Sequence, residues 1–431
     1  MKSLIFLGLG LAVTVAACGS SSSNPGTAPG SSDAGPADAG GFVPGAPITG
    51  LAQNKWTWVP IEGAKCRDGS STGIGVNLGT STDKVMIFLE GGGACFNATT
   101  CALMNPSKYG ASDFNGTFTA AEGNLGVFDR TDAMNPVSDW SYVYVPYCTG
   151  DIHAGNNVTG GDAGAGVANQ HFVGYVNVGL DLQRIVPTFP TASQVLLTGI
   201  SAGGFGASAN YAQVAKAFSS LPVALLDDSG PPMEDPYETT CQQKDVTALW
   251  GLDKTLLSDC GSDCSNPASY YLDYAKHIGK QYPNAPFGLV ESSQDMVITL
   301  FFGFGTDNGA NDCNGSLGTA ESGPMFTMGL QDVRTKLASN PKFGSFFFDG
   351  TDHTSLLSAL DTRTADGVVL AAWIKQLISG TATNVGLTGT ATDGGTDAGT
   401  PAADGGTDAG AATDAATPAD AAVDGGVALT L

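Results

Sequence analysis

One serine in this chain has the surroundings of a nucleophile. Ser201 stands at the centre of Gly199-Ile-Ser-Ala-Gly203, which matches the pattern G-x-S-x-G, and an apolar run at 194–200 leads into it. Small neighbours permit the sharp, strained turn between strand and helix that exposes such a hydroxyl. The pattern alone is weak in a chain with 60 glycines, and an ordinary turn is the alternative. The small residues that open the next segment, 204–212, favour the nucleophile.

A serine nucleophile needs a base, and in proteins with this turn the acid and then the histidine follow the serine in the chain. Only His277 and His353 lie after Ser201. His277 falls inside a predicted helix, on a face that we expect to be solvated. His353 follows the last predicted strand, where a loop can carry it to the serine. We therefore predict His353 as the base, the alternative being a histidine that only caps the loop.

The acid of such a triad holds the imidazole tautomer and stabilises the imidazolium without taking the proton itself. Asp295 follows the predicted strand 286–290, two strands after the nucleophile, and is the predicted acid. Asp228 follows the intervening strand and is the main alternative.

An oxyanion hole needs backbone N–H groups that face the reacting carbonyl. Ala202, next to the nucleophile, can supply one of them. Gly92 and Gly93 follow the apolar run 84–90 and can supply the others. A simple tight turn is the alternative interpretation of these glycines.

Six short apolar runs, each followed by a turn rich in Gly, Ser or Asp, predict the elements that position these residues. They are 84–90, 140–147, 194–200, 222–226, 286–290 and 344–348, and stretches of helix length lie between them at 176–185, 207–218, 270–280 and 328–338. Strands that are apolar on both faces are typical of a parallel sheet covered by helices. We predict an α/β fold of the α/β-hydrolase type: a doubly wound, mostly parallel sheet with helices on both faces, and its site at the carboxyl ends of the strands.

Composition divides the chain. Residues 1–17 resemble a bacterial export signal, and Cys18 follows Val15-Ala-Ala17 as in a lipoprotein signal, so we expect a lipidated Cys18; an ordinary signal with a chance cysteine is the alternative. Residues 18–48 are expected to form a disordered linker, 49–380 the catalytic domain and 381–431 a disordered acidic tail with seven Asp and no Lys or Arg. A calcium-binding repeat is the alternative for the tail, but it contains no twelve-residue calcium loop.

The other eight cysteines form an even set in an exported chain, which favours disulfides. Proximity suggests Cys95–Cys101 and Cys260–Cys264, which leaves Cys66, Cys148, Cys241 and Cys313 to form Cys66–Cys148 and Cys241–Cys313. Zinc at the Cys260/Cys264 pair is the alternative, although the four histidines are scattered. We expect no metal and no organic cofactor.

The formal net charge of −23 argues against nucleic acid or an anionic lipid surface as a partner. We expect membrane contact through the N-terminal lipid only, at the cell surface or in the periplasm, and a monomer. The acidic character also makes a strongly anionic polymer an awkward substrate.

With these residues in view, the chain resembles the pectin acetylesterase/Notum family of extracellular serine carboxylesterases. The resemblance runs from about residue 56 to 360. It rests on five features of the chain: Leu89-Glu-Gly-Gly-Gly-Ala-Cys-Phe-Asn97, Tyr147-Cys-Thr-Gly-Asp151, Gly199-Ile-Ser-Ala-Gly-Gly204, Asp228-Ser-Gly230, and Asp295 followed by His353.

The resemblance implies that Ser201, Asp295 and His353 form a triad, and that Gly92, Gly93 and Ala202 form the oxyanion hole. It also implies that the cysteines near the glycine loop form the family's disulfides. Ala94 stands where family members often carry an aromatic residue, which leaves acyl preference open. We expect hydrolysis of an O-acyl ester, with acetyl on an extracellular glycan first. Esters on lipids or proteins, amide hydrolysis and a non-catalytic binding protein are the alternatives.

Overall fold

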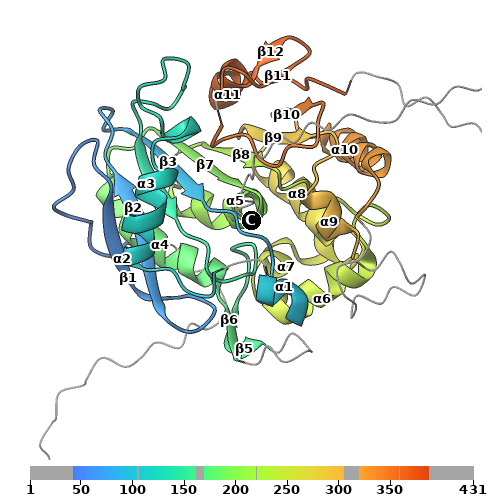
Figure 1. Ribbon diagram of the computed structural model, residues 1–431, viewed down its shortest axis with the longest axis horizontal. Coiled ribbons are helices and arrows are strands. Elements are labelled where there is room, and N and C mark those ends of the chain that lie inside the picture. The colour runs from blue at the N-terminus through green and yellow to red at the C-terminus, as the bar shows by residue number, and fades with distance from the viewer. Residues whose placement is uncertain are drawn as a thin grey trace, which may run out of the picture. The chain divides into compact units, whose positions relative to one another are not determined.

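An eight-stranded mixed sheet lies at the centre of the described part of the chain, in the order β1-β2-β4-β3-β7-β8-β9-β10 (Figure 1). Its strands are β1 Thr57–Lys65, β2 Ser71–Asn77, β3 Lys84–Leu89, β4 Ser141–Val145, β7 Gln194–Ile200, β8 Val223–Asp228, β9 Phe287–Ser292 and β10 Phe343–Phe348. The last six are parallel to one another and coincide with the six predicted apolar runs. The α/β-hydrolase-like fold class is therefore confirmed.

The computed structural model describes residues 42–103, 106–161, 169–219, 221–304, 320–358 and 360–387, all within one compact unit. The predicted export signal, Cys18, Cys313 and the tail from residue 388 lie outside the described residues. What the sequence predicts for them, including the Cys241–Cys313 disulfide, stays a prediction. Within the described ranges, no helix is long and apolar enough to cross a membrane.

The parallel strands are buried on both faces because alternate side chains enter two separate cores. In β3, Val85, Ile87 and Leu89 belong to one apolar cluster, whereas Met86 and Phe88 belong to another on the opposite face. The first cluster includes apolar residues of α4 and α5, and the second includes those of α11. This two-sided burial explains why the strands are continuous apolar runs.

The helices follow the expected alternation with strands, and the four predicted helical stretches correspond to α4, α5, α8 and α10. The α-helices are α1 Ala98–Leu103, α2 Ala111–Asp113, α3 Thr119–Ala121, α4 Gly174–Thr188, α5 Ala202–Ala217, α6 Thr240–Trp250, α7 Leu256–Cys260, α8 Tyr270–Gln281, α9 Ile298–Phe302, α10 Gly323–Leu337 and α11 Leu370–Ile378. Short π and 3₁₀ turns are η1 Phe114–Phe118, η2 Gly126–Phe128, η3 Leu252–Lys254 and η4 Gly261–Cys264. Two small hairpins pair β5 Asn157–Gly161 with β6 Gln170–Phe172, and β11 Thr364–Ala365 with β12 Val368–Val369.

The described residues contact the core a little beyond the expected domain 49–380 at both ends. The backbone N–H of Ile48 donates to the Thr188 hydroxyl at 2.7 Å, and the Ile48 side chain is buried. At the other end, the N–H of Val385 donates to the carbonyl oxygen of Ser345 at 2.8 Å, and Val385 forms a bridge with Phe346 of β10. Isolated apolar residues in polar segments are thus recruited to the core at both ends of the expected domain.

Three of the four expected disulfides are present: Cys66–Cys148, Cys95–Cys101 and Cys260–Cys264. Cys241 is also disulfide-bonded. Because Cys260 and Cys264 are bonded to each other, neither is available as the zinc ligand that the alternative interpretation required. Across the described ranges, no cluster of three or more His, Cys, Asp or Glu side chains is arranged to hold a metal ion.

Candidate active site

The predicted nucleophile lies at the carboxyl end of β7, in the middle of the sheet. Ser201 has φ 55° and ψ −124°, a conformation that residues with a side chain rarely adopt. Its flanking glycines are required by space. A Cβ on Gly199 would lie 2.2 Å from the Gly203 carbonyl oxygen, and a Cβ on Gly203 would lie 2.0 Å from that of Leu89. The G-x-S-x-G pattern therefore forms the strained turn that the sequence predicts.

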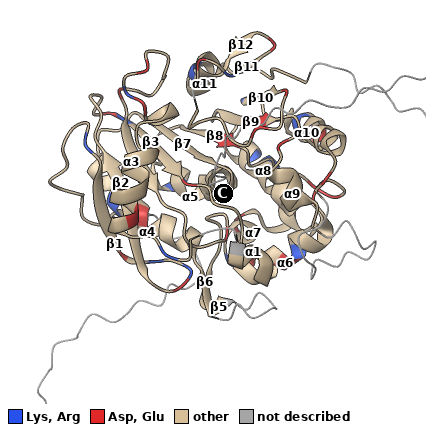
Figure 2. Ribbon diagram, in the orientation of Figure 1, with Lys and Arg blue, Asp and Glu red and all other residues tan. Residues whose placement is uncertain are grey.

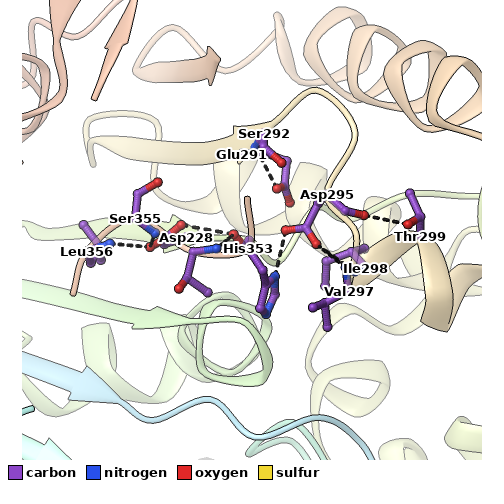
Figure 3. Close-up of polar contacts among 12 residues, drawn as sticks. Asp228, Glu291, Ser292, Asp295, Val297, Ile298, Thr299, His353, Ser355 and Leu356 are labelled. Atoms are coloured by element: carbon purple, nitrogen blue, oxygen red, sulfur yellow. Dashed lines mark hydrogen bonds and ion pairs between the residues drawn. The ribbon is translucent and has the colours of Figure 1, made fainter. Parts of the chain in front are cut away.

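Acidic residues lie at the carboxyl ends of β8 and β9, the two strands that follow β7 in the strand order (Figure 2). Asp295 follows β9 and is fully buried. Its Oδ2 lies 2.7 Å from Nδ1 of His353, and its Oδ1 accepts the backbone N–H groups of Val297 and Ile298 at 2.8 and 2.9 Å (Figure 3). The carboxylate is thus fixed in place by its own loop, while its other oxygen orients the imidazole.

The alternative acid, Asp228, holds the backbone that carries the histidine. Its Oδ2 accepts the N–H groups of Ser355 and Leu356 at 2.7 and 2.8 Å, just after His353 in the chain (Figure 3). Its carbonyl oxygen accepts the N–H of Ser201 at 2.7 Å. Burial raises the pKa of the Asp228 carboxyl to about 6, which leaves it mainly ionised at neutral pH. Asp228 therefore connects the serine turn to the histidine loop.

Glu291 is a buried carboxyl near Asp295 that no sequence pattern singled out. Glu291, in β9, is fully buried, and its Oε1 accepts the N–H of Ser292 at 2.8 Å. Burial, and then the charge of Asp295, raises the pKa of Glu291 well above its usual range. This shift favours the neutral form of Glu291. No sequence motif marks Glu291, because its role depends on which strand neighbours bury it.

The glycine loop after β3 adopts conformations that glycine allows. Gly92 and Gly93 have φ values of 149° and 77°. Behind the loop, His153 Nε2 lies 2.9 Å from the carbonyl oxygen of Glu90, so this nitrogen carries the proton and donates it. Burial lowers the pKa of His153 to about 4 and keeps the ring neutral. No sequence pattern distinguishes His153, because the histidines are scattered along the chain.

An apolar cavity opens beside the serine and encloses about 570 Å³, its open mouth included. Its lining comprises Gly93, Ala94, Phe96, Ile152, Ser201, Ala202, Phe205, Glu238, Gln242, Val246, Trp250, Tyr270, Tyr271, Ile298, Phe301 and Phe302. The cavity therefore brings together the nucleophile and two of the three predicted oxyanion residues. It also places Ala94 in its wall, and Ala94 is the residue whose small size leaves the acyl preference open.

One carboxyl in this cavity is expected to make stability depend on pH. The Glu238 side chain is 7% exposed, and burial raises its pKa from 4.5 to about 8. As the pH rises from about 5 to about 8, the unfolded state releases this proton while the native state keeps it. The free energy of unfolding should therefore fall by up to about 1.4 kcal/mol per pH unit on account of this group.

Urea denaturation of the wild type and of Glu238→Gln across this pH range measures that contribution. The variant should show the smaller fall in unfolding free energy, because glutamine does not titrate. Glu62→Gln, which changes an exposed carboxyl on β1, is the control and should keep the wild-type slope. Parallel slopes for the wild type and Glu238→Gln would show that Glu238 is ionised in the native state.

His277 differs from expectation. It lies in α8, as predicted, but it is 9% exposed rather than solvated. Its Nδ1 lies 2.9 Å from Asp263 Oδ2, and its Nε2 lies 2.7 Å from Gln281 Nε2. These contacts satisfy both ring nitrogens within α8 and the preceding turn, away from the residues gathered around Ser201.

The chain was compared with known protein families and with curated proteins. A family model described as pectinacetylesterase matches residues 52–299, more than half of the chain. The palmitoleoyl-protein carboxylesterase NOTUM of Schmidtea mediterranea is 35% identical over 98 residues, which cover 22% of this chain and 18% of that protein. Pectin acetylesterase 4 of Arabidopsis thaliana is 30% identical over 97 residues, which cover 22% and 23%. The chain thus matches only about a fifth of the length of these two relatives.

Among solved structures, the Wnt deacylase Notum from Drosophila superposes with a TM-score of 0.52 at 17% sequence identity. The superposition covers 76% of this chain and 94% of that one. At this level of identity the likeness shows a shared fold.

Proposed function

This chain belongs to the pectinacetylesterase family, and we propose that it is a serine carboxylesterase. The observation that carries the proposal is the strained Ser201 in the wall of an apolar cavity, with the Asp295–His353 pair held at the same edge of the sheet. The names of the relatives, which describe the removal of palmitoleoyl and acetyl groups, support ester hydrolysis.

In the proposed reaction, the Ser201 hydroxyl attacks the ester carbonyl while His353 Nε2 takes its proton. Asp295 holds the Nδ1–H tautomer that leaves Nε2 free to accept, and it stabilises the imidazolium that forms. Gly93 and Ala202 line the cavity, and in this proposal their N–H groups stabilise the oxyanion, together with that of the adjacent Gly92. His353 then protonates the leaving alcohol. In the second half of the reaction His353 takes a proton from water, the water attacks the acyl-enzyme, and the proton returns to Ser201 as the carboxylic acid leaves.

The cavity bears on the size of the acyl group. The cavity walls extend from Ala94 and Ala202 to apolar residues of α6, α8 and α9, so an acyl chain longer than acetyl would contact more apolar surface and displace water from it. We therefore propose an acyl group larger than acetyl as the first candidate. An O-acetyl group on a glycan, as the sequence suggests, is the second candidate, and the family's description favours it.

Hydrolysis of p-nitrophenyl esters with acyl chains from acetate to palmitate separates these two candidates. We expect kcat/KM to rise from acetate to an optimum at intermediate length, because each buried methylene contributes about 0.8 kcal/mol until the cavity is full. A preference that falls steadily from acetate onward would favour the acetylesterase. Absence of hydrolysis with every ester would contradict the proposed function itself.

We also propose that the chain is exported and anchored to a membrane through lipid on Cys18, with no other membrane contact. Support comes from the sequence of residues 1–18. Fractionation of a Cys18→Ala variant tests it, since a variant that stays with the membranes would contradict the anchor.

A further inference from the structure

The apolar cavity beside Ser201 contains two buried polar side chains that the proposed reaction does not use. Glu238 and Gln242 both line the cavity and are 7% and 5% exposed. Gln242 Oε1 has no hydrogen-bond partner among the described residues. Burial raises the pKa of the Glu238 carboxyl to about 8. The cavity wall therefore contains a buried carboxyl and a buried amide, and the oxygen of the amide has unmet hydrogen-bonding capacity.

Such groups are costly unless something bonds to them. An unsatisfied buried polar group destabilises a protein, and most native side chains avoid this cost. Apart from Ser201, Tyr270 and Tyr271, the rest of the cavity wall is apolar and does not explain a carboxyl and an amide in this place. A bound molecule that bonds to both groups would explain them.

The chemistry of the two side chains limits what that bonding group is. Glu238 is neutral at pH 7 because burial raises its pKa to about 8, so it offers one O–H donor and one acceptor oxygen. Gln242 Oε1 offers an acceptor. A hydroxyl both donates and accepts, and it satisfies this pair without bringing a charge into the cavity. An ammonium group would require an ionised Glu238, which burial opposes.

The same cavity contains the nucleophile, so the hydroxyl belongs to the acyl part of the substrate. We propose that the acyl group carries a hydroxyl at its end remote from the ester, bonded by Glu238 and Gln242; this inference rests on the proposed esterase function. Two acyl classes share this chemistry. A hydroxyaryl acyl group would pack its ring among Phe96, Trp250 and Phe301, and an ω-hydroxyalkanoyl chain would extend between the same walls.

Matched substrate pairs that differ only in the hydroxyl test the inference. The first pair is methyl p-coumarate and methyl cinnamate; the second is the p-nitrophenyl esters of ω-hydroxydecanoate and decanoate. For the accepted class, we expect wild-type kcat/KM to favour the hydroxylated member by about 10- to 100-fold, because the analogue would leave buried polar groups unpaired. The pair that shows this preference identifies the acyl class.

Substitutions of Glu238 and Gln242 then show whether these two side chains cause the preference for the hydroxylated substrate. In Glu238→Leu the ratio within the preferred pair should fall to about one, whereas Glu238→Gln, which keeps a donor and an acceptor, should retain most of it. Glu62→Leu makes the same change at an exposed position of β1 and should keep the wild-type ratio. Gln242→Leu is the second variant and should lower the ratio as well.

The outcomes separate this inference from the proposed function. A wild-type ratio near one for both pairs overturns the hydroxyl site even if plain esters are hydrolysed, and it does so without any variant. An unchanged ratio in folded Glu238→Leu and Gln242→Leu also overturns it. Failure to hydrolyse any ester, plain or hydroxylated, contradicts the esterase instead.

Discussion

Replacing Ser201 by alanine should lower kcat/KM for ester hydrolysis at least about a thousandfold, because no other group can form the acyl-enzyme. Alanine is smaller than serine and leaves the Ser201 N–H bond to the Asp228 carbonyl oxygen in place. The fold should therefore survive, which thermal unfolding followed by circular dichroism will check. The assay is hydrolysis of the best p-nitrophenyl ester found in the chain-length series.

Ser193→Ala is the matched control for this experiment. Ser193 hydrogen-bonds Asp83 on the exposed surface next to the start of β7, far along that strand from the serine turn. It should hydrolyse esters at the wild-type rate. Equal rates for the wild type and Ser201→Ala would contradict the nucleophile and favour the alternative of a non-catalytic binding protein on the same fold.

The sequence was most informative where chemistry depends on local spacing and chain order. The turn at Ser201 needs glycines two residues away on each side, so its signature lies within five residues. The parallel strands were visible because burial on both faces makes them continuous apolar runs. Since each parallel strand ends at the same edge, polar residues just after those runs, such as Asp295 and His353, could be assigned to one site.

The features that the sequence did not reveal depend on packing between distant segments. β1 was missed because Pro60 and Gly63 interrupt its apolar pattern, which an edge strand tolerates. Glu238 lies before α6, and nothing in the residues around it distinguishes a carboxyl in a cavity from one in solvent. Glu291 looks like the polar end of a strand, but its neighbours β8 and β10 enclose it.

The roles of the two aspartates show the same distinction. Sequence spacing placed Asp228 and Asp295 at the ends of neighbouring strands and could only rank them. The structure gives them different contacts: Asp295 lies against the His353 ring, whereas Asp228 binds the N–H groups of the loop after it. Both contacts require a long-range approach of β8, β9 and the loop after β10, which no local pattern encodes.

Replacing Asp295 by asparagine should lower kcat by about ten-thousandfold with little change in KM. The amide oxygen can still accept the N–H groups of Val297 and Ile298, so the loop should keep its shape. The amide nitrogen, however, would donate to Nδ1 of His353 and force the proton onto Nε2. The imidazole could then no longer accept the proton of Ser201. Steady-state kinetics on the best p-nitrophenyl ester measures this effect.

The Asp228→Asn variant tests whether the loss of activity in Asp295→Asn comes from removing the triad acid or from removing any carboxyl group near the site. An amide oxygen can accept the N–H groups of Ser355 and Leu356 as the carboxylate does, and the amide nitrogen can donate to the Ser229 hydroxyl. The histidine loop should stay in place, and we expect kcat to fall by less than about tenfold. If Asp228→Asn loses as much activity as Asp295→Asn while its unfolding temperature stays at the wild-type value, the acid must be reassigned to Asp228. Both variants replace one carboxyl group at the same edge of the sheet by an amide. A large loss of activity in Asp295→Asn alone would therefore show that the contact of Asp295 with the imidazole sets the tautomer.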